Sequence, residues 1–270
     1  MQRFAFFVDG SNQYSSLKSM QLEVDDYERF YAYIYAEAAS KWRLTTQSPL
    51  TYPTQLRRIY WYVLGSIDEW DLTSPQAQLV LRKTFDEDNE IRTWWIAAVD
   101  KGDACLTEVT LSDKAWIECL ADFRRWYEHK RYQLEGMRRF HHSIRMSTAM
   151  IDVIEEGHWK VDFFRKEAEE KGLDTALAVG MIAQADNFDV AVVSTGDADS
   201  VPAIRFLKER NKVVCAVEFV RGAPPEGKGQ SFSSRLKMHA DFVVRIFEAE
   251  LLRHGHARRP SAPQAPQARS

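Results

Sequence analysis

The segment VAVVSTGDAD, residues 190–199, decides the fold predicted for this chain. Its first four residues are apolar and either small or β-branched, which is typical of a buried parallel strand. Ser200–Lys208 follows with Pro202 at a first-turn position and apolar residues three apart, which predicts a helix. Asp197 and Asp199 therefore lie where a strand ends and a helix begins, the place where open α/β sheets bind ligands. Taken alone, the two acids fit a helix cap as well as a metal site.

Two further acids are expected at the same edge of the sheet. Phe4–Val8 is a continuous apolar run that predicts a central strand, and Asp9 follows it at once. Asp174 lies at the start of Thr175–Ile182, a run of small residues that predicts a helix packed closely on a sheet. Because the carboxyl ends of parallel strands meet at one edge, we expect both acids to share a pocket with the first pair.

Four carboxylates in one pocket would repel one another and raise one another's pKa. A hard divalent cation removes this conflict, and all-oxygen ligands favour Mg²⁺ or Mn²⁺. A site without Cys or His ligands does not suit zinc. The usual chemistry of such a site is phosphoryl transfer or phosphodiester hydrolysis, in which the metal activates a water and neutralises charge in the transition state.

Other phosphate-binding and hydrolase motifs are absent from the sequence. It contains no G-x-x-x-x-G-K-[ST] loop and no G-x-G-x-x-G after a strand. G-x-S-x-G and H-E-x-x-H are missing as well. The sequence therefore indicates neither nucleotide-cofactor binding nor a serine hydrolase.

Length and composition limit the possible domain architectures and cellular environments of the chain. The 270 residues are 45% apolar and 28% charged, enough for one large domain or for a domain with a sizeable insertion. The formal net charge of −3 does not by itself require a polyanionic partner. Cys105, Cys119 and Cys215 have no paired spacing, so we expect no disulfide framework and a reduced, cytoplasmic setting. No apolar run approaches membrane-spanning length and Asp9 interrupts the apolar start, so we expect neither a membrane partner nor a signal peptide.

Residues 71–150 interrupt the alternation of strand and helix patterns, and they predict a helical-hairpin insertion. One helix is expected after Ser74 and a second from Ser112 to about Ser147. Apolar residues at steps of three and four form a seam along the second helix. The seam consists of Leu120, Phe123, Tyr127, Leu134, Met137 and Ile144. It could pack within the chain or form a homodimer, and the sequence leaves both open.

Four arginines recur every seven residues beside this seam: Arg124, Arg131, Arg138 and Arg145. At about 1.5 Å per residue, the row spans roughly 30 Å. Residues 124–145 contain seven Lys or Arg and only two Glu. The row is either a solvated flank of the hairpin or a ridge that follows the phosphates of RNA.

After the insertion the pattern returns to mixed α/β. Ile151–Val161 predicts an edge hairpin that turns at Glu156 and Gly157. Lys212–Val217 and Phe242–Ile246 predict two more strands.

This organisation predicts one α/β domain over residues 1–250. Its core is expected at 1–70 and 151–250, with the insertion at about 71–150. The tail at 254–270 is rich in Pro, Ala and Arg and should be disordered.

Four short motifs occur in order along the chain. They are FVDGSN at 7–12, EKGLD at 170–174 followed by ALA at 176–178, STGDAD at 194–199 and ADF at 240–242. Together they resemble the NYN domain of the LabA-like branch of the PIN-like nuclease superfamily, over residues 1–68 and 151–247. The resemblance implies a PIN-like three-layer α/β/α sandwich with a mostly parallel central sheet.

The resemblance also implies a metal-dependent ribonuclease. By motif position, its catalytic and metal-binding residues are Asp9, Asp174, Asp197 and Asp199. Polar support near the phosphate would come from Asn12 together with Ser194 or Thr195. Lys171 is a further candidate for contact with the scissile phosphate, or else it is solvated.

Two positions depart from the family pattern. Similar proteins commonly carry Asp where Gly180 stands and an aromatic residue where Ser200 stands, and loss of that acid could weaken a second metal position. The leading hypothesis is a Mg²⁺- or Mn²⁺-dependent endonuclease that acts on single-stranded or structured RNA. The alternatives are a catalytically weak RNA-binding or regulatory adaptor and a small-molecule phosphohydrolase.

Overall fold

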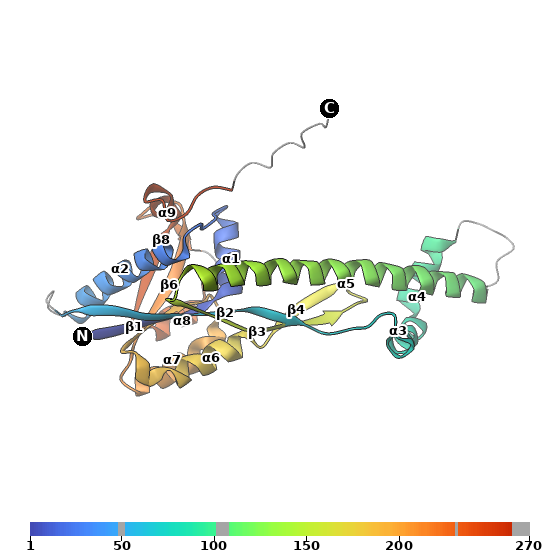
Figure 1. The fold of residues 1–270 in the computed structure, drawn as a ribbon, viewed down its shortest axis with the longest axis horizontal. Coiled ribbons are helices and arrows are strands. Elements are labelled where there is room, and N and C mark those ends of the chain that lie inside the picture. Colours follow the sequence, from blue (N-terminus) through green and yellow to red (C-terminus); the bar gives the residue numbers. More distant parts are fainter. Residues whose placement is uncertain (48–51, 101–107, 230–231, 261–270) are drawn as a thin grey trace, which may run out of the picture. The chain divides into compact units, whose positions relative to one another are not determined.

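The computed structural model describes residues 1–47, 52–100, 108–229 and 232–260, and Figure 1 shows its helices and strands. Contacts divide the chain into two compact units. The first, here called the sheet unit, comprises residues 1–64, 140–157 and 172–270. The second, here called the helical unit, comprises residues 65–139 and 158–171. The helical unit thus takes in residues 158–171, which we expected in the core.

Parallel strands form the centre of the sheet. β1 (Gln2–Asp9) pairs in parallel with β2 (Thr54–Ile67) and with β5 (Val190–Ser194). β5 pairs in parallel with β6 (Val213–Arg221), which pairs in parallel with β8 (Phe242–Phe247). The prediction of a mostly parallel central sheet is confirmed, and the carboxyl ends of these strands share one edge.

Three more strands complete the sheet, whose order is β4-β3-β2-β1-β5-β6-β7 with β8 beside β6. β3 (Ile151–Asp162) and β4 (Glu167–Lys171) form an antiparallel hairpin, and β7 (Lys228–Gly229) is antiparallel to β6. The turn predicted at Glu156 and Gly157 is wrong, because β3 runs through both residues. A Cβ on Gly157 would lie 3.0 Å from the Cα of Leu64 on β2. Glycine is therefore needed for the close approach of two strands and not for a turn.

Helices cover both faces of the sheet, which gives the three layers that were predicted (Figure 1). Along β1, Phe4 and Phe6 belong to one apolar core and Ala5 and Phe7 to the other, and all four are buried. Burial on both faces explains why β1 is a continuous apolar run. The first core includes residues of α1 (Gly10–Ser19), α2 (Tyr27–Thr46) and α9 (Glu248–Arg253). The second includes residues of α6 (Leu173–Ala183), α7 (Val201–Glu209) and α8 (Ser234–His239).

The helical unit carries α3 (Pro75–Glu87), α4 (Asn89–Val99) and most of α5 (Glu108–Ser147). Within it, the seam residues Phe123 and Tyr127 pack on Phe163, with ring centroids 5.5 and 5.6 Å apart. These seam residues are buried within a single chain, so a dimer is not needed to cover them, and a homodimer stays a prediction. No helix among the described residues has both the length and the apolar content needed to cross a lipid bilayer.

The carboxyl-terminal segment is ordered further than predicted. We expected disorder from residue 254, but residues 254–260 have a described conformation, and Ala257 is buried. Arg258 forms ion pairs with Glu23 and Asp25, each at 2.7 Å, and its backbone also pairs with that of Glu23. Tail composition could not reveal this, because the acids that hold Arg258 lie more than 200 residues away in sequence. Residues 261–270 lie outside the described residues.

Gly157→Ala should lower the free energy of unfolding by about 2 kcal/mol, because the new methyl group would meet backbone atoms of β2 that cannot move aside. Those atoms are the Cα and N of Leu64 and the carbonyl oxygen of Val63, at 3.0–3.2 Å. The matched control is Gly136→Ala on α5, where nothing lies within 4 Å and Ala should stabilise the helix by up to about 1 kcal/mol. Urea denaturation followed by circular dichroism measures both changes. Equal stability of the two variants would contradict the close strand contact.

Candidate metal centre

The loop after β5 places two carboxylates at the carboxyl edge of the sheet. A short 3-10 helix, η2 (Ala198–Ser200), joins β5 to α7. Thr195 Oγ1 accepts the backbone N–H of Asp197 at 3.1 Å, and Asp197 Oδ1 accepts the backbone N–H of Asp199 at 3.0 Å. The loop therefore folds through its own short-range hydrogen bonds, while the side chains of both aspartates stay exposed.

Helix capping accounts for only one of these acids. Asp197 caps η2 through its hydrogen bond to the N–H of Asp199. α7 begins after Ser200 and has no side-chain cap hydrogen bond. Among the described residues, the carboxylate of Asp199 accepts no hydrogen bond that would explain its position. Capping therefore leaves Asp199 unexplained.

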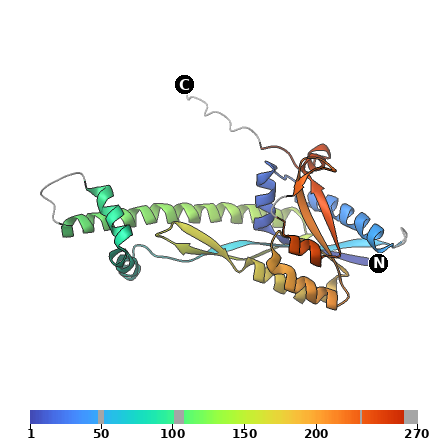
Figure 2. The same cartoon turned by 180° about the vertical axis from the view of Figure 1, so that it is seen from behind.

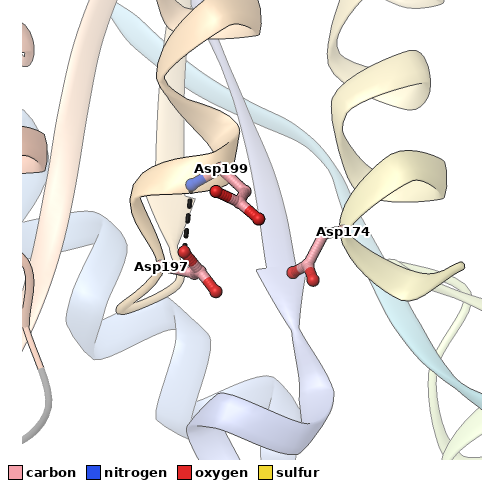
Figure 3. Close-up of side chains that lie close together, drawn as sticks. All are labelled: Asp174, Asp197 and Asp199. Atoms are coloured by element: carbon pink, nitrogen blue, oxygen red, sulfur yellow. Dashed lines mark hydrogen bonds between the residues drawn. The ribbon is translucent and has the colours of Figure 1, made fainter. Parts of the chain in front are cut away.

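Asp174 completes a cluster with this pair. It lies in the first turn of α6, just after Gly172, whose φ of +83° is a left-handed conformation that favours glycine. One carboxylate oxygen from each of Asp174, Asp197 and Asp199 lies within 4.8 Å of the other two. Figure 3 shows the three side chains turned toward a common space from two different elements. We call these three residues the acidic cluster.

The carboxylates of the acidic cluster repel one another. Partial burial and the charges of Asp197 and Asp199 raise the pKa of Asp174. Carboxylate oxygens are hard ligands and the cluster contains no Cys or His, so its donor set fits Mg²⁺ or Mn²⁺ better than zinc. No second cluster of this kind occurs in the described part of the chain.

The fourth predicted acid, Asp9, lies outside the acidic cluster. It ends β1 and is only 6% exposed. One of its carboxylate oxygens accepts the N–H of Asn12 at 2.8 Å, which caps α1, and the other accepts the hydroxyl of Thr195 at 3.1 Å. Thr195 also accepts the N–H of Asp197. Asp9 therefore holds the loop between β5 and α7, here called the acidic loop, in place from the neighbouring strand. The sequence contained no signal for this link, and direct metal binding by Asp9 stays a prediction.

The other predicted contacts to substrate differ in their exposure. Asn12 is half-buried in the first turn of α1, whereas Ser194 and Thr195 are each only 3% exposed. Lys171 belongs to the helical unit, where it forms an ion pair with Glu169. Contact of these residues with RNA stays a prediction.

Three of the four arginines in the row on α5 hydrogen-bond to backbone carbonyl oxygens. In the helical unit, Arg124 donates to Leu72 and Arg138 to Gly65, both at 2.9 Å. In the sheet unit, Arg145 donates to Val153 at 3.0 Å. These arginines fasten α5 to neighbouring segments, a role that neither interpretation of the row had included. Contact of the row with RNA, including Arg131, stays a prediction.

Gly180 is explained by packing. A Cβ on Gly180 would lie 1.6 Å from the hydroxyl oxygen of Tyr62, which is buried on β2. An aspartate at this position would therefore collide with Tyr62. The tyrosine occupies the space that an acid at position 180 would need. The packing of α6 on the sheet therefore explains why this position is not an acid.

Comparison with known proteins finds similarity to one family over part of the chain. The family model of the NYN domain matches residues 111–243, just under half of the chain. The match contains the whole acidic cluster, leaves Asp9 and Asn12 outside, and includes much of α5, where the sequence motifs had shown no resemblance. It supports an NYN domain in this chain, and the α/β fold is consistent with the PIN-like NYN fold.

One solved structure is similar to the chain, a protein of unknown function from Vibrio parahaemolyticus. It is 14% identical, with a TM-score of 0.45, and the alignment covers 92% of this chain and 94% of that one. No curated protein matches the chain.

Asp174→Asn should raise the melting temperature of the metal-free protein at pH 7 by about 2 °C, because it removes one of three exposed charges that repel one another. The raised pKa means that the folded state binds this proton more tightly than the unfolded state. The stability contributed by Asp174 is therefore lost as the pH rises through its folded pKa.

The gain should accordingly vanish below the ordinary Asp pKa of about 3.9, where wild type and variant are both neutral at this position. Differential scanning fluorimetry in EDTA at pH 7 and pH 3.5 measures it. The control is Glu37→Gln, which neutralises an exposed acid of α2 and should give no gain. A lower melting temperature of Asp174→Asn at pH 7 would show that favourable contacts hold this carboxylate.

Proposed function

We propose that this chain, in which residues 111–243 match the NYN domain, is a Mg²⁺- or Mn²⁺-dependent endoribonuclease of the LabA-like branch. The observation that carries the proposal is the acidic cluster of Asp174, Asp197 and Asp199 at the carboxyl edge of a mostly parallel sheet. Its charge conflict is one that a divalent cation relieves. Its exposure leaves room for a polymeric substrate to approach.

The residues of the site would divide into metal ligands and residues that position them. Asp174, Asp197 and Asp199 would hold the metal, which when bound activates a water and neutralises charge in the transition state of phosphodiester hydrolysis. Asp9 would position the loop through Thr195. These supporting residues would keep the cluster in one geometry, since a site that loosens by about 1 Å loses much of its activity.

Substrate contact would come from the rim of the cluster. Asn12 is half-buried at the start of α1 and keeps its proposed role in contacting the phosphate. Ser194 and Thr195 are buried, so they would act by shaping the loop. The protein would work in a reduced, cytoplasmic setting, which agrees with the free, buried thiols of Cys119 and Cys215.

A second candidate function is an RNA-binding or regulatory adaptor with little turnover. Two observations favour it: the cluster brings together three acids and not four, and Tyr62 excludes an acid at position 180. Metal binding separates the two candidates. A nuclease should give heat with Mn²⁺ in calorimetry and a higher melting temperature when Mn²⁺ is present, because a ligand that binds only the folded state stabilises it.

Asp199→Asn should reduce Mn²⁺-dependent cleavage of a mixed RNA substrate by about 100-fold or more, because it removes a metal ligand without removing a structural hydrogen bond. The variant should fold normally and lose the Mn²⁺-dependent rise in melting temperature. The matched control is Asp186→Asn, which neutralises an exposed aspartate outside the cluster and should keep full activity.

The outcomes separate the hypotheses. Full activity of Asp199→Asn would overturn the proposed site. No cleavage and no Mn²⁺ binding by the wild type would favour the adaptor. Metal-dependent hydrolysis of a nitrophenyl phosphate with none of RNA would favour a small-molecule phosphohydrolase.

A further inference from the structure

α7 and α8 lie next to each other and next to the acidic loop (Figure 2). The backbone N–H of Ser233, the N-cap of α8, donates to the carbonyl of Gly196 at 3.0 Å, and Gly196 directly precedes Asp197. At the other end of α8, Nε2 of His239 lies 3.1 Å from Nη2 of Arg205 on α7. The two helices thus lead from the acidic cluster to a basic region that they share.

Three cations lie close enough to His239 to affect its pKa, and of these only Lys208 forms an ion pair with an acid among the described residues. Lys208 forms an ion pair with Asp241 at 2.8 Å. Arg205 hydrogen-bonds to the ring of His239, and Arg235 has no acidic partner among the described residues. Burial and the charges of Arg205, Arg235 and Lys208 lower the pKa of His239, so at pH 7 its imidazole is neutral and can accept the N–H of Arg205. Within the described ranges, the guanidinium charges of Arg205 and Arg235 therefore have no acidic partner.

Arg205 and Arg235 are exposed and lie on two neighbouring helices. Arg235 and His239 are four residues apart, so they lie on one face of α8. Asp199 lies in the 3-10 helix η2, and Arg205 lies six residues later on α7. At a rise of about 1.5 to 2 Å per residue, they are about 9 to 12 Å apart along the chain. That distance corresponds to roughly three nucleotides of a stacked strand, whose rise is about 3.4 Å. We call Arg205, Arg235 and His239 the basic strip.

Resting on the proposed function, we infer that the basic strip binds the phosphates of the RNA strand on one side of the scissile bond. A guanidinium group is always charged and donates two parallel hydrogen bonds to a phosphate. Phosphates would supply the negative charge that Arg205 and Arg235 lack among the described residues. The arginine row on α5 is less suited to this task, because three of its four members already donate to backbone carbonyls.

The test measures RNA binding apart from cleavage. A fluorescent single-stranded RNA of about 20 nucleotides is titrated with protein in EDTA, and anisotropy gives the affinity over a range of KCl concentrations. Arg205→Ala/Arg235→Ala should bind about tenfold more weakly at low salt, and the slope of log affinity against log salt should fall by about 1.4, since each phosphate contact on a single strand contributes about 0.7.

The matched control is Lys41→Ala/Arg57→Ala, which removes two exposed cations of α2 and β2 and should leave affinity and slope unchanged. Circular dichroism verifies that both double variants fold. An unchanged slope in the strip variant, an equal loss in the control, or no RNA binding by the wild type would overturn the inference. RNA binding that depends on the strip, without Mn²⁺-dependent cleavage by the wild type, would uphold the strip and refute the nuclease.

Discussion

The hydrogen bond from Thr195 to Asp9 joins the carboxyl ends of the two central strands, and the acidic cluster depends on it. Asp9 is buried, so both of its oxygens need partners, and they find them in Asn12 and Thr195. Thr195 in turn accepts the N–H of Asp197. The buried carboxylate of Asp9 therefore caps a helix and links two strands. It also positions the loop that carries two exposed carboxylates.

The acidic cluster opposes stability at the edge of an otherwise well-packed sheet. Both faces of the sheet are covered by apolar side chains, and the strands between them are buried. Three like charges from α6 and from the β5–α7 loop then meet at one exposed edge. Replacing one of these carboxylates by a neutral residue would make the fold more stable. Repulsion between carboxylates that is kept at a sheet edge therefore indicates a functional site.

The two groups of arginines show that a high density of positive charge in a sequence does not mean that the charged groups are free to bind a ligand. The row on α5 is regular and conspicuous, yet most of its guanidinium groups are committed to backbone carbonyls. Arg205 and Arg235 attract no notice in the sequence, because they lie 30 residues apart on two short helices. Packing of α7 on α8 brings both near one histidine, and neither has an acidic partner in the part of the chain that the structure describes.

The sequence by itself determined the strands β1, β5, β6 and β8, the helices α3, α5, α6 and α7, the parallel sheet and the acids Asp174, Asp197 and Asp199. Each of these follows from local patterns: apolar runs for buried strands, a Pro near a helix start, and acids directly after strand ends. The sequence did not indicate β4 or β7, and it wrongly placed a turn within β3. Tertiary structure alone decided that Asp9 supports the loop from within the core, that Gly157 and Gly180 leave room for β2, and that Arg258 pairs with two acids near the amino terminus. Those outcomes depend on which distant residues meet, because burial, close approach and ion pairing are properties of pairs that the order of residues along the chain does not specify.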